Sequence, residues 1–163
     1  MGPVSFRVNQ SRPGAAFQLD ELSKQIIEKL QQDGRRSYTG IGKAVGLSEA
    51  AVRQRVQRLV DTGALQIVGV TDPLTLGFQR QAMVGIRCSG DLERVAEQLA
   101  VLEEIDYVVI TAGSFDLLIE VVCEDDDHLL EILSRVRSVP SVTGTETFVY
   151  LKLLKQTYSW GTR

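Results

Sequence analysis

The stretch GLSEAAVRQRVQRLVDTG, residues 46–63, decides the fold of the first part of this 163-residue chain. Ser48 is a typical helix N-cap residue, and Thr62-Gly63 is a typical helix end. Between them the apolar residues Val52, Val56 and Leu59 recur at helical spacing. The stretch therefore predicts one helix that packs along a single side.

The other side of this helix is polar and cationic. Ala50, Gln54, Gln57 and Arg58 lie roughly opposite the apolar stripe, and Arg53 and Arg55 flank that face. Glutamine can pair with adenine through two hydrogen bonds, and arginine can bind guanine or phosphate. The alternative is a solvated charged face on an ordinary three-helix unit. The candidate DNA-binding residues are Ser48, Ala50, Arg53, Gln54, Arg55, Gln57 and Arg58.

Two shorter helices are predicted before it. Asp20 caps a helix that Gly34 ends, and Ser37 begins a second one that reaches Val45. With Gly46 as the turn, this order predicts a helix-turn-helix domain. The alternating residues 65–70 predict a strand, which would form a wing or the start of a linker.

Charge is distributed unevenly along the chain. Residues 1–63 carry 10 Lys/Arg against 6 Asp/Glu, whereas residues 64–163 carry 8 against 15. The net charge of −3 thus hides a basic first part suited to a polyanion. No membrane span or signal peptide is expected. Cys88 and Cys123 are expected to be reduced core residues, and no metal site is expected.

The second half of the chain alternates strand and helix patterns. Predicted strands cover residues 82–88, 107–112, 117–123 and 145–154, and predicted helices cover 92–102 and 126–136. This β-α-β-β-α-β order is ferredoxin-like and leaves one sheet face bare. We expect that face to carry Val108, Ile110, Ile119 and Val121, and a second copy to cover it.

The predicted fold class is therefore α+β, with a winged-type three-helix domain followed by a ferredoxin-like domain. The predicted divisions are a flexible tail (1–18), the helix-turn-helix domain (19–64), a strand and linker (65–80), the ferredoxin-like domain (81–157) and a C-terminal tail (158–163).

Several motifs, in order, resemble the leucine-responsive/asparagine-regulator (Lrp/AsnC) transcription factors. The resemblance covers about residues 18–157. It rests on Ser48-x3-Val52-x2-Arg55-x2-Arg58-Leu59-x3-Gly63-x-Leu65, Asp72-Pro73, Leu76-Gly77, Thr111-Ala112-Gly113-Ser114-Phe115-Asp116, Thr145-Glu146-Thr147 and Lys155-Gln156.

The resemblance implies a cytoplasmic, nucleoid-associated prokaryotic regulator that binds an operator in double-stranded DNA and assembles as a dimer, tetramer or octamer. It implies that residues 81–157 form a ligand-sensing and oligomerisation domain. It implies no cofactor, but an amino-acid or related effector that changes assembly or DNA binding. The implied effector site comprises Gly113, Ser114, Phe115, Asp116, Thr145 and Thr147. Asp116 could pair with an α-ammonium group.

Three alternatives remain open at the level of the residues. Residues 113–116 could be a hairpin turn with a polar cap and no ligand. The ferredoxin-like half could be an enzyme, although no nucleophile–base pair or phosphate loop is visible. The chain could also compact DNA without any effector.

Overall fold

The computed structural model describes residues 19–157, 161 and 162. The chain divides into two compact units, which are described separately. The first holds the described residues up to Gly69 together with the described residues from Gln156 onward, and the second is Val70–Lys155. The flexible tail predicted for residues 1–18 lies outside the described residues.

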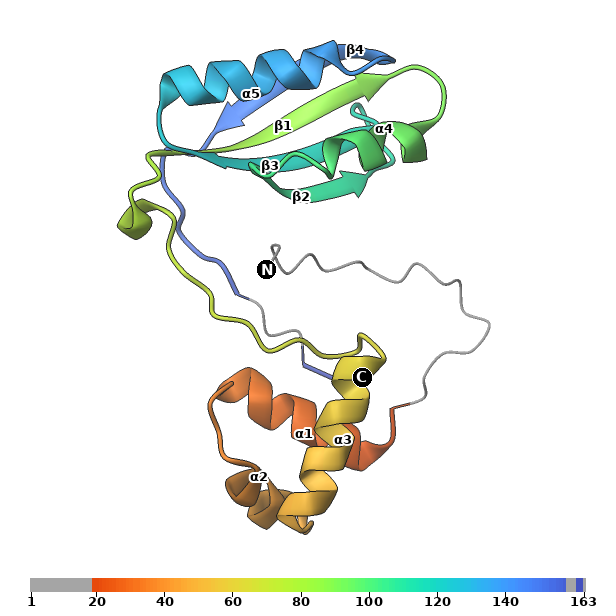
Figure 1. Cartoon of the computed structure of the whole chain (residues 1–163), viewed down its shortest axis with the longest axis vertical. Coiled ribbons are helices and arrows are strands. Elements are labelled where there is room, and N and C mark those ends of the chain that lie inside the picture. Colours follow the sequence, from red (N-terminus) through yellow and green to blue (C-terminus); the bar gives the residue numbers. More distant parts are fainter. Residues whose placement is uncertain (1–18, 158–160, 163) are drawn as a thin grey trace. The chain divides into compact units, whose positions relative to one another are not determined.

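The first unit consists of three helices: α1 (Glu21–Gln32), α2 (Tyr38–Val45) and α3 (Glu49–Asp61) (Figure 1). The three predicted N-caps are confirmed. Asp20 accepts from the Ser23 amide at 2.8 Å, Ser37 from the Gly40 amide at 3.1 Å, and Ser48 from the Ala51 amide at 3.2 Å. One buried cluster joins the helices, with Ile26, Leu30, Ile41, Val52 and Val56 at its centre.

A tight turn joins α2 to α3. Gly46 ends α2 with φ 74°, a left-handed conformation that glycine adopts without strain. Gly42 lies so close to the turn that a Cβ there would be 2.5 Å from the carbonyl oxygen of Leu47. These two glycines therefore set the angle between α2 and the helix that follows.

The strand predicted over residues 65–70 is wrong. This segment is irregular, and Gln66–Val70 is exposed to solvent. An alternating pattern forms a strand only where a neighbouring strand accepts its backbone hydrogen bonds, and no such strand lies beside it among the described residues. The described part of the unit is thus a three-helix domain without a wing.

The second unit has the predicted β-α-β-β-α-β order. Its elements are β1 (Arg80–Cys88), α4 (Leu92–Leu99), β2 (Ile105–Ile110), β3 (Leu117–Cys123), α5 (Asp126–Ser138) and β4 (Val142–Val149), preceded by the short 3₁₀ turn η1 (Leu74–Leu76). The sheet order is β2-β3-β1-β4 and every pair is antiparallel. This is the ferredoxin-like arrangement (Figure 1).

Two elements, α4 and β4, differ clearly from the prediction in where they begin or end. Helix α4 stops at Leu99 instead of Leu102, with Ala100 as its C-cap. Strand β4 covers Val142–Val149 instead of residues 145–154, and its pairing with β1 ends at Ala82 and Val149. Residues 151–157 are exposed, with Leu151 97 % exposed.

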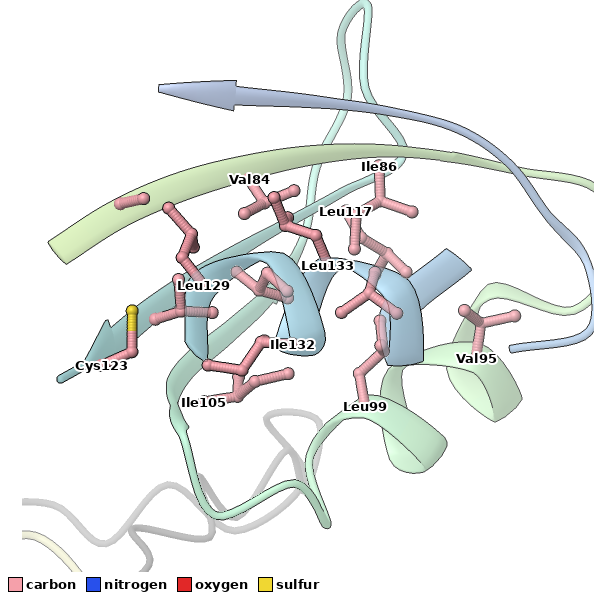
Figure 2. Packing of buried hydrophobic residues seen from close by; sticks show 14 residues of the cluster. Val84, Ile86, Val95, Leu99, Ile105, Leu117, Cys123, Leu129, Ile132 and Leu133 are labelled. Carbon is pink, nitrogen blue, oxygen red and sulfur yellow. The ribbon is translucent and has the colours of Figure 1, made fainter. Parts of the chain in front are cut away.

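The helices α4 and α5 cover one face of the sheet and bury its main core. Side chains from α5, including Leu129, Ile132 and Leu133, meet Val84 and Ile86 of β1 in one cluster (Figure 2). Cys123 is buried in this cluster and Cys88 is half-buried, both with free thiols.

The predicted composition of the bare face is wrong. Ile119 and Val121 are fully buried in the core beneath the helices, and Val108 packs against the same core. Ile110 pairs with buried Leu117 and so points to the same side. The bare face instead carries the alternate residues of each strand, which include Met83, Gly85, Tyr107, Leu118, Glu120, Val122 and Phe148.

The end of the chain belongs to the first unit. The Thr162 hydroxyl donates to Glu28 Oε1 on α1 at 2.5 Å. The second unit ends at Lys155, and Thr162, which lies in the predicted C-terminal tail of residues 158–163, contacts α1. No helix among the described residues is long and apolar enough to cross a membrane.

Candidate functional site

The outward face of α3 matches the prediction. Val52, Val56 and Leu59 are at most 2 % exposed, so the packed side of α3 is fixed. The opposite side faces solvent and is hollowed along its length. The residues lining this hollow are Glu49, Ala50, Arg53, Gln54, Gln57, Arg58 and Asp61. Four predicted DNA contacts, Ala50, Gln54, Gln57 and Arg58, thus share one exposed surface.

Arg55 lies elsewhere. Its Nη1 donates to Asp20 Oδ2 at 2.6 Å and to Ser23 Oγ at 3.2 Å, so it ties α3 to the start of α1. Hydrogen bonds from Ser23 and Arg55 lower the pKa of Asp20 from 3.8 to about 2. Asp20 therefore caps α1 and anchors α3 at once. A helical wheel of α3 could not reveal a partner 35 residues away.

Arg53 forms a second link, between α3 and α2. Its Nη2 donates to Glu49 Oε1 at 2.9 Å, and its guanidinium lies 5.2 Å from the centre of the Tyr38 ring. Thr39 donates to Glu49 Oε2 at 2.6 Å. The hydrogen bonds from Thr39 and Arg53 lower the pKa of Glu49, which keeps it ionised. Arg53 remains 64 % exposed and can still reach a phosphate.

We expect Arg55→Ala to weaken binding to every DNA sequence without changing the salt dependence. The Arg55–Asp20 pair positions α3 and is worth about 1 kcal/mol after solvent screening, so affinity should fall at most about fivefold. A lost phosphate contact would instead make the slope of log affinity against log salt shallower by about 0.9. Anisotropy titrations at several salt concentrations separate the two cases, and Arg55→Lys should restore part of the loss.

Acid should remove the contribution of Asp20 to stability. The pKa of Asp20 is lowered from 3.8 to about 2. Its contribution to the unfolding free energy is therefore complete above pH 3.8 and is lost as the pH falls through about 2. Asp20→Asn keeps a good N-cap without the charge. The difference in unfolding free energy between wild type and Asp20→Asn should shrink between about pH 5 and pH 2. A constant difference would contradict the assignment.

The predicted effector loop is the connection between β2 and β3. Asp116 fixes this loop against β1, because its Oδ2 accepts from the Cys88 amide at 2.8 Å and its amide donates to Ile86 at 2.9 Å. The Thr111 hydroxyl donates to the Phe115 carbonyl at 2.6 Å. Gly113 and Ser114 are exposed at the tip. One oxygen of Asp116 is therefore already used within the chain.

Phe115 packs on the bare face of the sheet. Its ring lies against Gly85, where a Cβ would come within 2.7 Å of the ring. The Arg87 guanidinium is 4.7 Å from the ring centre, and the Phe148 ring meets it edge-on at 6.1 Å between centroids. Sequence reasoning missed these neighbours of Phe115. The available signal was Gly85 inside an apolar strand, since a glycine in a strand often marks a place where another group packs closely on the backbone.

The structure does not bring the two predicted threonines to Phe115. Thr145 and Thr147 pair with Ile86 and Val84, whose side chains are buried beneath the helices. Thr145 accepts from Arg137 Nε of α5 at 2.9 Å, beside a small hollow lined by Arg137 and Val142–Thr145. The threonines thus lie on the helix side of the sheet, and within one chain the six predicted residues do not form a pocket on a single face.

Comparison with known proteins gives a consistent result. Residues 19–60 match the AsnC-type helix-turn-helix domain, and residues 78–163 match a C-terminal dimeric alpha+beta barrel domain of AsnC regulators. The HTH-type transcriptional regulator FL11 of Pyrococcus horikoshii is 33 % identical over 141 residues, which is 85 % of this chain and 93 % of FL11.

Solved structures share the fold. The leucine response regulatory protein of Mycobacterium tuberculosis has a TM-score of 0.78 and 25 % identity, over 85 % of this chain and 96 % of that one. A Neisseria meningitidis transcriptional regulator in complex with L-Met has a TM-score of 0.75 and 22 % identity, over 87 % of this chain and 96 % of that one. These relatives are regulators and not enzymes. The chain therefore belongs to the Lrp/AsnC family of DNA-binding transcriptional regulators.

Proposed function

We propose that this regulator is sequence-specific and that an amino acid or related small molecule controls its assembly or its DNA binding. The observation that carries the first part is the exposed outward face of α3. Its cations and amides stand on a helix held rigidly by the Arg55–Asp20 and Glu49–Thr39 contacts. A regulator of this kind acts on the chromosome, so the proposal includes a cytoplasmic, nucleoid-associated location.

A gel shift tests sequence specificity. The full chain is titrated with a duplex from its own promoter region and with random duplexes of the same length. The promoter duplex should bind more tightly, and affinity should fall steeply with salt as phosphate contacts release counterions. Equal affinity for both duplexes would contradict the proposal.

The effector proposal rests on the Gly113–Asp116 loop. Asp116 Oδ2 is used by the Cys88 amide, and its other oxygen is available to a ligand ammonium group. The Neisseria regulator of the same fold has L-Met bound, which supports an amino acid as the class of ligand. Thr145 and Thr147 lie across the sheet from Phe115, so for all six residues to act together a second copy would have to contribute some of them.

Asp116→Asn should abolish stabilisation by the effector. Asparagine keeps an oxygen for the Cys88 amide but loses the charge that attracts an ammonium group. Thermal-shift screening of the twenty amino acids identifies the ligand. At about 100 times its dissociation constant the ligand should stabilise the wild type by roughly 2.7 kcal/mol. An unchanged shift in Asp116→Asn would place the site elsewhere, and no shift with any amino acid would favour a DNA-compacting protein without an effector.

We also propose that a second copy covers the bare sheet face. This face exposes apolar surface such as Tyr107 (48 %) and Phe148 (45 %), and the matching family has a dimeric C-terminal domain. Tetramers or octamers would then form from such dimers. Sedimentation equilibrium should show dimers or larger assemblies, whereas a monomer at micromolar concentration would contradict this.

A further inference from the structure

The centre of the outward face of α3 is formed by Ala50 and Gln54. The buried stripe of α3 runs through Val52, Val56 and Leu59. At 100° per residue, Ala50 and Gln54 lie opposite that stripe. They are four residues apart, so they are neighbours on consecutive turns of the helix. Both are exposed, and Gln54 also lines a second hollow between α3 and the start of α1. A duplex docked on this face would meet these two side chains first.

The side chains beside them are already engaged. The Arg53 guanidinium is held by Glu49 and by the Tyr38 ring. The Gln57 amide nitrogen donates to Asp61 Oδ1 at 2.8 Å. The Gln54 amide, in contrast, makes no hydrogen bond within the described part of the chain. Its oxygen and nitrogen are both available, and they are the acceptor and donor pair that the major-groove edge of adenine requires.

Ala50 and Gln54 lie in the first half of α3. The side-chain charges balance at both ends of the helix, because Arg53 offsets Glu49 at 2.9 Å and Arg58 shares the last turn with Asp61. The peptide dipoles of the helix give its N-terminus a partial positive charge, which favours phosphates there. Helix-turn-helix proteins read base edges with the N-terminal residues of the recognition helix, and the positions of Ala50 and Gln54 fit that geometry.

We infer that Gln54 is the residue that determines specificity for an A·T pair in each half-site, with its amide on adenine N6 and N7 in the major groove. The Ala50 methyl group lies one turn earlier and contacts the 5-methyl group of a thymine at the same or the adjacent pair. This inference rests on the proposed sequence-specific DNA binding.

The test is selection from a duplex library with about 20 randomised base pairs, which spans two half-sites. Wild type, Gln54→Ala and the control Gln98→Ala, at an exposed glutamine on α4 of the second unit, are selected in parallel as full-length proteins. Wild type and Gln98→Ala should enrich the same motif, with one A·T pair per half-site that Gln54→Ala no longer prefers. A bidentate contact should make that preference about 5-fold to 150-fold. Circular dichroism confirms that each variant is folded.

Modified bases then locate the contact at that pair. Replacing its adenine by 7-deazaadenine, which lacks the N7 acceptor, should weaken wild type but leave Gln54→Ala unaffected. Replacing the thymine by uracil should weaken wild type more than Ala50→Gly. If the A·T preference persists in Gln54→Ala, or is lost equally in Gln98→Ala, the inference is overturned. If wild type selects no motif, the proposed sequence specificity fails as well.

Discussion

Replacing Ala50 by glutamate should reduce DNA affinity at least about 100-fold, because the new carboxylate would lie against base edges and phosphates. Like charges brought together in an interface cost several kcal/mol. Ala50 is exposed on α3 and glutamate is a good helix former, so folding should be unaffected. Anisotropy titration with the promoter duplex measures the loss.

Gln98→Glu is the matched control for this substitution. It changes the net charge by the same amount, and Gln98 is exposed on α4 of the second unit. Its affinity for DNA should stay within about twofold of wild type, because Gln98 is not part of the outward face of α3 and exposed charges are screened by salt. Equal losses in the two variants would show that net charge, and not the outward face of α3, controls binding.

Ile132→Ala should lower the unfolding free energy of the second unit by about 2–5 kcal/mol. Ile132 is fully buried between α5 and the sheet, so truncation removes apolar contacts and leaves a cavity (Figure 2). For a unit of this size the midpoint should fall by at least about 8 °C. Calorimetry at a fixed protein concentration gives the shift.

Leu130→Ala provides the comparison on the same helix. Leu130 is 59 % exposed, and its truncation should change stability by no more than about 0.5 kcal/mol. Because α1–α3 have their own core, Ile132→Ala should leave their amide-exchange protection unchanged. Equal decreases in the midpoint temperature of Ile132→Ala and Leu130→Ala would contradict the assignment of Ile132 to the buried core.

The helices were predictable because their signals are local. Asp20, Ser37 and Ser48 cap the three helices as predicted, and the apolar stripe of α3 is the buried one. The fold order of the second unit was equally predictable from its alternating patterns. The ends of the elements were less predictable, because the end of β4 depends on how far it pairs with β1, a strand distant in sequence.

The orientation of the sheet was not predictable from apolar residues alone. Both alternating sets of β3 are apolar, so hydrophobicity does not show which set faces the helices. Glu120 belongs to the same set as Leu118 and Val122, and it was the clue that this set lies on the bare face. The choice of Ile119 and Val121 for the bare face ignored that carboxylate.

The candidate sites were predicted only in part for a related reason. The outward face of α3 follows from helical spacing, whereas the Arg55–Asp20 contact joins residues far apart in sequence. Phe115 and Thr145 are near one another in the family resemblance, yet the register of β1 with β4 places Thr145 on the other side of the sheet. Strand register depends on pairing, which one strand's sequence does not contain.

Hydrogen–deuterium exchange of the full chain, with and without its promoter duplex, tests most directly the claim that α3 is the DNA-reading element. Peptides covering Ser48–Asp61 should gain the largest protection when DNA is bound, and an excess of salt should reverse it. If the largest protection instead appears within Val70–Lys155 and residues 48–61 are unchanged, α3 does not read DNA and the account is wrong.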